Sequence, residues 1–487
     1  MKTGKKILVA VLIGLLLFIC FLFYNLFSYK SRQIKVATVK EMPVSESAFY
    51  RLASSLKIKT VSTESGLTMD SLEFNKFSDF LSTNYPLIDS MLERVVVNKY
   101  SSLYIWKGSN PALKPVILMA HLDVVPVLET ELKDWTHPPF DGKIVDDTLW
   151  GRGAIDDKIG LIGIMEAVEG LLERGFIPGR TMYIAFGHDE EIGGQNGAAA
   201  IASYLKEKGV NAEFVLDEGG SIVQRMVPGI EKDVALIGVS EKGFVSLELM
   251  VDMEGGHSSM PNSETSIDII AKAINKLRSN QFPAKLCPAL EGFIDELGPE
   301  MPALNKFVFA NRFIFEPLIL DIYEGSAAGN ALVRTTLVPT IFNSGVKDNV
   351  IPRLAKATIN IRILPGSSID EVINEVKGII DDERIRTNKN DFYSEPSKTS
   401  TTISAGYRIL NTSILEVFPE VLTAPNLVIG ATDSRHFESI SADIYRFLPI
   451  YINPENIKTF HGINERIAKR DFNSAVRFYS RLIQNCN

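Results

Sequence analysis

The sequence of 487 residues is poor in cysteine and in histidine, with three and six residues of these types. Cys20, Cys287 and Cys486 cannot form a disulfide framework and lack the spacing of a metal finger. The chain also lacks an excess of basic residues, because 51 Lys and Arg stand against 59 Asp and Glu and leave a net charge of −8. This balance excludes a polybasic nucleic-acid-binding protein, so we expect no nucleic-acid partner. The sequence shows no repeat of fixed period.

The overall composition is that of a globular protein. Hydrophobic residues make up 45% of the chain and charged residues 23%, which suffices for a substantial buried core and argues against intrinsic disorder. At roughly 100–200 residues per domain, the length predicts two or three domains.

One long apolar run occurs, at the amino terminus. Residues 7–27 carry no charge, and basic residues precede and follow them. About 20 apolar residues can cross a bilayer as a helix. The run is long for a signal peptide and no small-residue cleavage site follows, so we predict that residues 1–35 form a single-pass membrane anchor, with a cleaved secretory signal as the alternative. Basic residues on both sides leave the orientation nearly undecided, and the position near the start favours an extracytoplasmic body.

Short apolar runs alternate with amphipathic stretches in residues 36–238. The runs at 115–120, 181–187 and 213–216 are typical of strands buried on both faces, and residues 159–172 are apolar nearly all round, as in a packed helix. This order predicts an α/β domain with a mostly parallel central sheet flanked by helices.

The pattern changes in residues 239–398. Two runs alternate between apolar and polar residues, at 244–250 and 357–364, and helix-like runs follow them at 267–278 and 369–380. Alternation predicts strands with one solvent-facing side, hence an inserted α+β domain. Residues 399–487 are then expected to complete the first domain.

Polar residues with metal-binding chemistry follow the predicted strands. His121 and Asp123 come after the first run, Glu190 and Glu191 after the second, and Asp217 after the third, while Asp156 lies just before the predicted helix. Ligands of open α/β sheets collect at the carboxyl ends of strands. Each residue alone has an ordinary structural interpretation, but several carboxylates at one sheet edge would repel one another without a cation. Nitrogen and carboxylate donors suit zinc, with manganese or cobalt as alternatives.

Eight segments resemble, in order, the signatures of metallopeptidase family 20. They are MAHLDVVP (119–126), LWGRGAIDDK (149–158), GHDEEIGG (187–194), LDEGG (216–220), GGHSSMP (255–261), NVIP (349–352), IRILPG (361–366) and FHGINE (460–465). This family of di-zinc amidohydrolases includes aminoacylase, carnosinase, succinyl-diaminopimelate desuccinylase and the Gly-X carboxypeptidases. The resemblance runs from about Ser45 to the carboxyl terminus. LDEGG and GATDSRHF (430–437) are most similar to the Gly-X carboxypeptidase and N-fatty-acyl-amino-acid hydrolase branch.

The resemblance implies two zinc ions per subunit. In it, His121 and Glu191 bind one zinc, Asp217 and His461 bind the other, and Asp156 bridges both, with a cis peptide bond between Asp156 and Asp157.

The resemblance also implies catalytic and substrate-binding roles. Asp123 would orient His121, and Glu190 would be the general base. His257 would polarise the scissile carbonyl in a neighbouring subunit's site, which implies a homodimer through the inserted lid domain. Arg362 would bind the substrate carboxylate, and Asn349 is a candidate polar contact in the same pocket.

These expectations combine into one predicted function: a zinc-dependent hydrolase that cleaves an amide bond next to a free carboxylate by means of a metal-activated water. The substrate would be a small peptide or an N-acyl amino acid. A dipeptidase or a desuccinylase- or deacetylase-type amidohydrolase is the alternative enzyme, and a catalytically silent metal-binding receptor or scaffold is the alternative outside enzymes.

Overall fold

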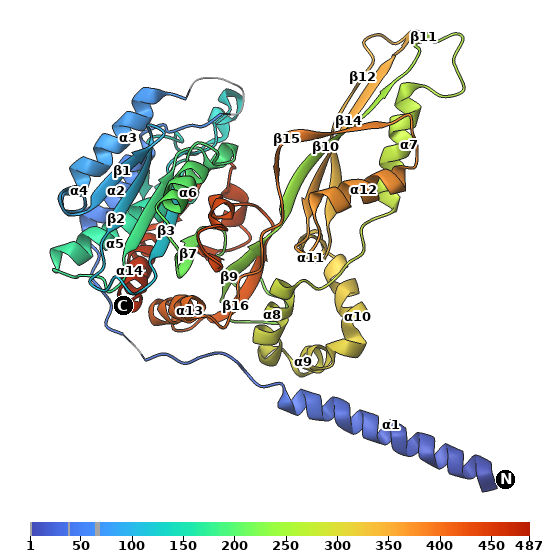
Figure 1. Ribbon diagram of the computed structural model, residues 1–487, viewed down its shortest axis with the longest axis horizontal. Helices are drawn as coiled ribbons and strands as arrows, with labels where there is room; N and C mark the ends of the chain where they lie inside the picture. The colour runs from blue at the N-terminus through green and yellow to red at the C-terminus, as the bar shows by residue number, and fades with distance from the viewer. Residues whose placement is uncertain (1, 38, 64–68) are drawn as a thin grey trace. The chain divides into compact units, whose positions relative to one another are not determined.

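The computed structural model describes residues 2–37, 39–63 and 69–487. The chain forms two compact units (Figure 1). Unit 1 comprises Met1–Lys30, Ser240–Thr399 and Leu427–Ala431, and unit 2 comprises Ser31–Val239, Ser400–Asn426 and Thr432–Asn487. Both units are therefore discontinuous in sequence.

A ten-stranded sheet organises unit 2, with strand order β1-β2-β6-β3-β7-β17-β9-β8-β18 and β16 paired to β9. The strands are β1 (Glu93–Val97), β2 (Ser101–Trp106), β3 (Val116–His121), β6 (Met182–Gly187), β7 (Phe214–Asp217), β8 (Ile222–Val223), β9 (Val234–Glu241), β16 (Leu422–Val428), β17 (Ile444–Arg446) and β18 (Tyr451–Ile452). Neighbours among β6, β3, β7 and β17 are parallel, whereas β1–β2, β2–β6, β17–β9 and β8–β9 are antiparallel. The sheet is thus mixed, which corrects the mostly parallel sheet expected from the sequence: the neighbours among β6, β3, β7 and β17 at its centre and the short pair β18–β8 at its edge are parallel.

Helices cover both faces of this central sheet. Ile117 and Met119 of β3 pack in one cluster with Ile201 and Leu205 of α6 (Ala198–Glu207). Because successive strand side chains point to opposite faces, the residues between them face α5 (Lys158–Glu173), which contacts β3 from the other side. The helix α5 is buried almost all round because α14 (Lys469–Asn485), α2 (Glu46–Leu56) and α4 (Pro86–Met91) also pack on it.

Smaller elements complete unit 2. They are α3 (Ser71–Asn84), α13 (Ala405–Val417) and a three-stranded sheet of β4 (Lys143–Val145), β5 (Thr148–Trp150) and β19 (Arg466–Ala468).

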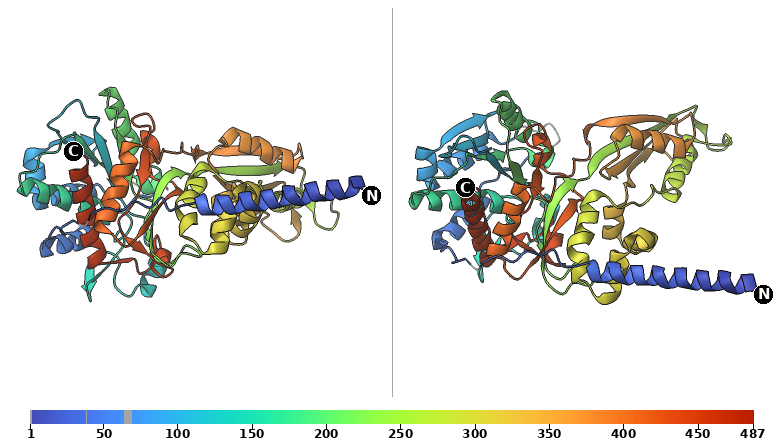
Figure 2. Two further views of the ribbon diagram at one scale, coloured as in Figure 1. Left: turned by 90° about the horizontal axis from the view of Figure 1, so that it is seen from below. Right: turned by 60° about the horizontal axis from the view of Figure 1, so that its bottom comes forward.

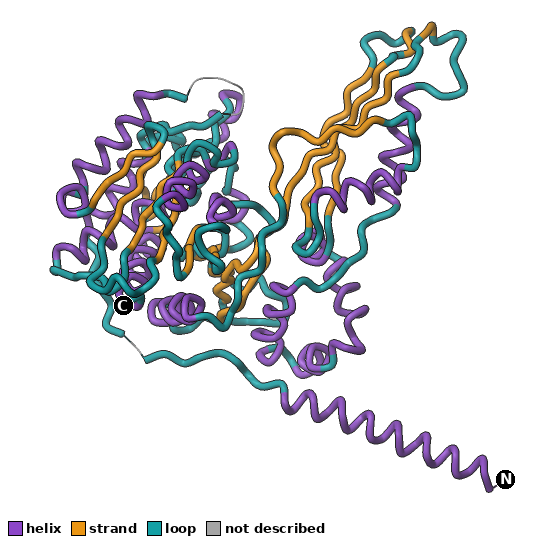
Figure 3. Tube along the Cα trace, in the orientation of Figure 1, coloured by secondary structure: helices purple, strands orange, loops and turns teal. Residues whose placement is uncertain are grey.

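An antiparallel sheet of order β12-β14-β10-β15 forms the centre of unit 1. Its strands are β10 (Gly243–Asp252), β12 (Thr336–Ser344), β14 (Leu354–Ile363) and β15 (Arg386–Ser394), and two short strands, β11 (Gly256–His257) and β13 (Val350–Ile351), pair separately. The alternating runs become β10 and β14, whose inward residues pack on α7 (Ser266–Ser279) and α12 (Ile369–Ile380). Figure 3 shows both helices beside the strands.

Unit 1 also contains a helical insert that the sequence patterns did not predict. It comprises α8 (Pro288–Leu297), α9 (Ala303–Ala310), α10 (Arg312–Glu324) and α11 (Ala327–Val333). The amino-terminal helix α1 (Lys2–Ser28) contacts this insert, as Figures 1 and 2 show. Within the described residues, Thr3–Ser28 is the one helix long and apolar enough to cross a membrane, a property that signal sequences share.

Candidate functional site

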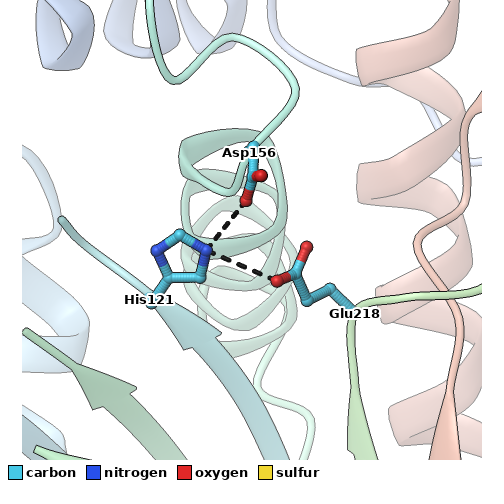
Figure 4. Close-up of side chains that lie close together, drawn as sticks. All are labelled: His121, Asp156 and Glu218. Atoms are coloured by element: carbon cyan, nitrogen blue, oxygen red, sulfur yellow. Dashed lines mark hydrogen bonds and ion pairs between the residues drawn. The ribbon is translucent and has the colours of Figure 1, made fainter. Parts of the chain in front are cut away.

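Two groups of potential metal ligands share Asp156 in unit 2. In the first, His121 Nε2 lies 2.9 Å from Asp156 Oδ1 and 3.4 Å from Glu218 Oε1 (Figure 4). In the second, His461 Nε2 lies 2.9 Å from Asp156 Oδ2 and 3.2 Å from Glu191 Oε2. The ligand atoms of each group all lie within 4.8 Å of one another. One carboxylate therefore presents an oxygen to each of two neighbouring clusters.

The strand ends explain why these side chains meet. His121 is the last residue of β3, Glu191 lies in the turn after β6, and Glu218 directly follows β7. Because β6, β3 and β7 are parallel neighbours, their carboxyl ends share one edge of the sheet. Asp156 comes from the loop before α5, and His461 from a loop in which its own φ is +54°. The peptide bond between Asp156 and Asp157 is cis, as the resemblance implied.

Asp217 stays a predicted ligand, and the structure places a second carboxylate, Glu218, next to His121. The strand β7 extends through Asp217, whose Oδ2 accepts a hydrogen bond of 2.8 Å from the backbone N–H of Ser434. Because neighbouring residues at a strand end point in opposite directions, the next side chain, Glu218, is the one directed to His121.

The potential metal ligands are also grouped differently from what the resemblance implies. His121 was expected with Glu191, but it lies with Glu218, and Glu191 lies with His461.

Asp123 links His121 to the turn that follows β6. It is fully buried, and its Oδ1 lies 3.4 Å from His121 Nδ1, which also lies 3.0 Å from the Asp123 backbone carbonyl. The same carboxylate accepts backbone N–H groups of Glu190 and Glu191 at 3.1 and 3.2 Å, and the Ser62 hydroxyl at 2.6 Å. Asp123 thus fixes the ring of one potential ligand and the backbone of another.

Glu465 performs a similar function for the loop that carries Asp156. This fully buried carboxylate accepts N–H groups of Gly153, Ile155 and Asp156 at 3.1, 2.7 and 3.2 Å. Arg152 donates to the same carboxylate at 2.7 Å and to the His461 carbonyl at 3.2 Å. One ion pair therefore holds the two loops that carry Asp156 and His461.

The carboxylates are electrostatically unfavourable neighbours when no cation is bound. Burial, with the nearby charge of Asp156, raises the pKa of Glu218 to about 8. Burial likewise raises the pKa of Glu191. Burial alone would raise the pKa of Asp156, but hydrogen bonds from His121 and His461 hold it below its usual value. Hydrogen bonds to Asp156 and Glu191 raise the pKa of His461 to about 10.

The donor set fits a pair of divalent cations. Three carboxylates and two imidazoles converge, which is a nitrogen and oxygen set suited to zinc. The buried Oε1 of Glu191 has no hydrogen-bond partner among the residues that the structure describes, so this oxygen is available to a ligand. A cation would also favour the charged forms of Glu218 and Glu191 and so offset their burial.

Glu190 is adjacent to both clusters. Its backbone is fixed by Asp123, and burial, opposed by the charge of His121, raises the pKa of its carboxyl well above the ordinary value. Carboxyl groups with raised pKa values can accept and return protons near neutral pH.

The remaining predicted residues belong to unit 1 and separate into two locations. His257 and Asn349 lie together at the β11–β13 pair, where the Ser258 N–H donates to the Asn349 carbonyl at 3.2 Å. Arg362 lies opposite Phe244 at the other end of β10, with its guanidinium 4.8 Å from that ring. The eight residue steps from Phe244 to Asp252 span about 26 Å of strand. Asn349 and Arg362 therefore lie far apart within one chain, and the pocket that the resemblance implies for both stays a prediction.

Sequence reasoning missed Glu218 and Glu465. A signal for Glu218 was present, because it directly follows Asp217, the acid that ends β7, and neighbouring side chains of an extended backbone point in different directions. Glu465 offered no comparable signal, since a single buried glutamate in a loop has no periodicity.

Comparisons with known proteins agree with this geometry. Residues 117–485 match the family model described as peptidase family M20/M25/M40. The chain is 39% identical to probable carboxypeptidase S-like 2 of Dictyostelium discoideum, over 99% of this chain and 94% of that protein. It is 41% identical to the N-fatty-acyl-amino acid synthase/hydrolase PM20D1 of Homo sapiens, over 90% of this chain and 87% of that protein.

The fold also matches a solved structure, an M20 family metallo-carboxypeptidase from Sulfolobus solfataricus. The TM-score is 0.66 at 18% identity, and the match covers 91% of this chain and 99% of that one.

Proposed function

The chain belongs to peptidase family M20/M25/M40 and is a peptidase or amidohydrolase; on that premise we propose that it is a zinc-dependent hydrolase of an amide bond adjacent to a free carboxylate. The observation that carries this proposal is the central position of Asp156, which offers one oxygen to each of two ligand clusters. The names of the relatives, carboxypeptidase and N-fatty-acyl-amino acid synthase/hydrolase, support a small peptide or an N-acyl amino acid as substrate.

In this proposal the two clusters hold two zinc ions, with cobalt or manganese as alternatives. His121 and Glu218 would hold one ion, His461 and Glu191 the other, and Asp156 both. When bound, such ions would polarise a water molecule and the scissile carbonyl.

Glu190 would act as the general base. The Asp123 carboxylate holds the backbone of Glu190 and of its neighbour Glu191, which would serve as a ligand. The raised pKa of Glu190 lets its carboxylate take a proton from the attacking water and return it to the leaving amine.

Arg362 would bind the substrate carboxylate, with Asn349 as a further polar contact to the substrate, and His257 would stabilise the developing oxyanion. Within unit 1, Arg362 and His257 are separated by the stretch of β10 from Phe244 to Asp252, which is about 26 Å long. One small substrate cannot span that distance. If both contact the same substrate, they come from two copies of the chain, so the proposal includes a homodimer through unit 1.

The general base is tested by Glu190→Gln. We expect this variant to retain both metal ions and to lose at least about 100-fold in kcat, because the group that moves the proton is removed. The assay compares a Gly-X dipeptide, an N-acetyl amino acid and an N-fatty-acyl amino acid with their amidated, carboxylate-free counterparts. Undiminished turnover in Glu190→Gln contradicts its role, and equal cleavage of the amidated substrates contradicts carboxylate recognition.

A further inference from the structure

The helical insert of unit 1 presents an apolar surface beside α1. Every residue of α9 is at least partly exposed, and α10 buries Ile319 alone among its thirteen residues. Large apolar side chains are exposed on these two helices, with Leu304 74% accessible and Leu318 46%; the others are Phe313, Ile314 and Ile322. Exposed apolar patches of this kind mark binding surfaces in water-soluble proteins. We call the patch formed by these five residues the insert surface.

The insert is built onto one face of α1. The partly buried side chains at this end of α1 are Leu22, Asn25 and Leu26, followed by Tyr29 just after the helix, at the i, i+3, i+4 and i+7 spacing of one helix face. Phe21 and Phe23 contact Phe313 and Phe307, with ring centroids 5.9 and 5.7 Å apart. The Tyr29 hydroxyl donates to the Ile294 carbonyl.

A polar pair inside this junction is internally satisfied. Asn25 Nδ2 donates to Asn311 Oδ1 at 3.0 Å, and Asn311 Nδ2 donates to the carbonyls of Leu22 at 3.2 Å and Phe307 at 2.9 Å. Asn311 is fully buried. Such pairing is the condition that a polar side chain must meet at membrane depth. The junction therefore suits an α1 that is retained in the folded protein.

From this junction we propose that α1 and the insert surface contact one lipid bilayer, with α1 crossing it and α9 and α10 lying in its interfacial layer. The apolar run of α1 ends at Phe27 and is followed by exposed Lys30 and Lys35, which mark the boundary with the headgroups. Phe23 and Phe21 lie four and six residues before that end, or about 6 and 9 Å inside it at 1.5 Å per residue.

The depth of these aromatic contacts below the headgroups agrees with an interfacial position of α9 and α10. The insert residues that touch Phe21 and Phe23 are placed at the same depth as those rings, and interfacial helices bury their apolar faces about 5–10 Å. The exposed carboxylates Glu316 and Asp321 of α10 limit deeper insertion, because they must stay at the headgroup level. This inference is independent of the proposed hydrolase chemistry.

The test uses the full chain with Cys20→Ser, which leaves the two buried cysteines Cys287 and Cys486. Leu318→Cys and Leu304→Cys carry an environment-sensitive fluorophore on the insert surface. Glu316→Cys is the control on the same helix, since two residues turn a helix by about 200° and place position 316 on the side of α10 opposite Leu318. Val346→Cys, which is 98% exposed in the loop after β12, is the second control.

Each labelled chain is reconstituted in phosphatidylcholine–phosphatidylglycerol vesicles with and without brominated acyl chains. We expect quenching of the probes at 318 and 304 that exceeds quenching at 316 and 346 by about twofold or more, because only the former reach the acyl boundary. Equal quenching at all four positions overturns the proposal. Shielding of positions 318 and 304 that depends on protein concentration and not on bromination also overturns it, because a second copy would then cover the surface.

Discussion

Removing the metal should make the stability of unit 2 fall as pH rises, and Glu218 gives the clearest magnitude. Burial raises the pKa of this carboxyl from 4.5 to about 8. Between these two pH values the folded chain keeps a proton on Glu218 that the unfolded chain has released. The contribution of Glu218 to stability is therefore fully present below pH 4.5 and is lost as pH rises toward 8. One proton corresponds to about 1.4 kcal/mol per pH unit, hence on the order of 5 kcal/mol across the window.

Other groups of the site act in the same direction. Burial raises the pKa of Glu191, and hydrogen bonds to Asp156 and Glu191 raise the pKa of His461 to about 10, so its contribution is lost between pH 6.5 and 10. Bound cations need deprotonated carboxylates and neutral imidazoles, so metal binding should stabilise the chain more strongly as pH rises.

The assay is thermal unfolding of chelator-treated and zinc-loaded protein at several values between pH 5.5 and 8. We expect the Tm of the metal-free protein to fall by about 2–4 °C per pH unit for each such proton, and the gap to the loaded protein to widen. Glu218→Gln should remove about one proton from that dependence in the metal-free state. A metal-free Tm that rises or stays constant over this range, or an unchanged slope in Glu218→Gln, refutes the reasoning.

Four variants, the first of them Glu218→Gln again, test individual contacts. Glu218→Gln should lower the bound metal by about one ion per chain, whereas Asp217→Asn should retain two, as measured by elemental analysis; the reverse result restores Asp217 as the ligand. Asp123→Asn should weaken metal affinity by about 10–100-fold in a chelator competition, because the carboxylate that orients His121 is lost, and an unchanged affinity contradicts that role. Glu465→Ala should lower the free energy of unfolding by about 3–5 kcal/mol, because Arg152 loses its buried partner; a loss below about 1 kcal/mol by denaturant titration argues against the link between loops.

The central strands and their polar ends could be predicted because burial leaves a direct trace in sequence. Apolar runs at 115–120, 181–187 and 213–216 become β3, β6 and β7, and residues at their carboxyl ends meet because parallel strands end together. The antiparallel strands at the edges of the sheet show no such continuous apolar run in the sequence. Short strands such as β8 have too few residues to show a period.

The resemblance does not indicate in which direction each carboxylate of the site points. The motif LDEGG contains two adjacent carboxylates, and the choice between Asp217 and Glu218 depends on where β7 ends. The helical insert was missed for another reason. Its α9 and α10 expose apolar residues around much of their circumference, so the usual alternation of buried and exposed faces is weak.

The most direct measurement is the metal content of the purified chain together with its amide hydrolysis before and after chelation. Clusters that share Asp156 predict two zinc equivalents per chain, hydrolysis that disappears when the ions are removed, and recovery when zinc is returned. A folded chain that binds no divalent cation, or that hydrolyses its substrate equally well in excess chelator, contradicts the assignment.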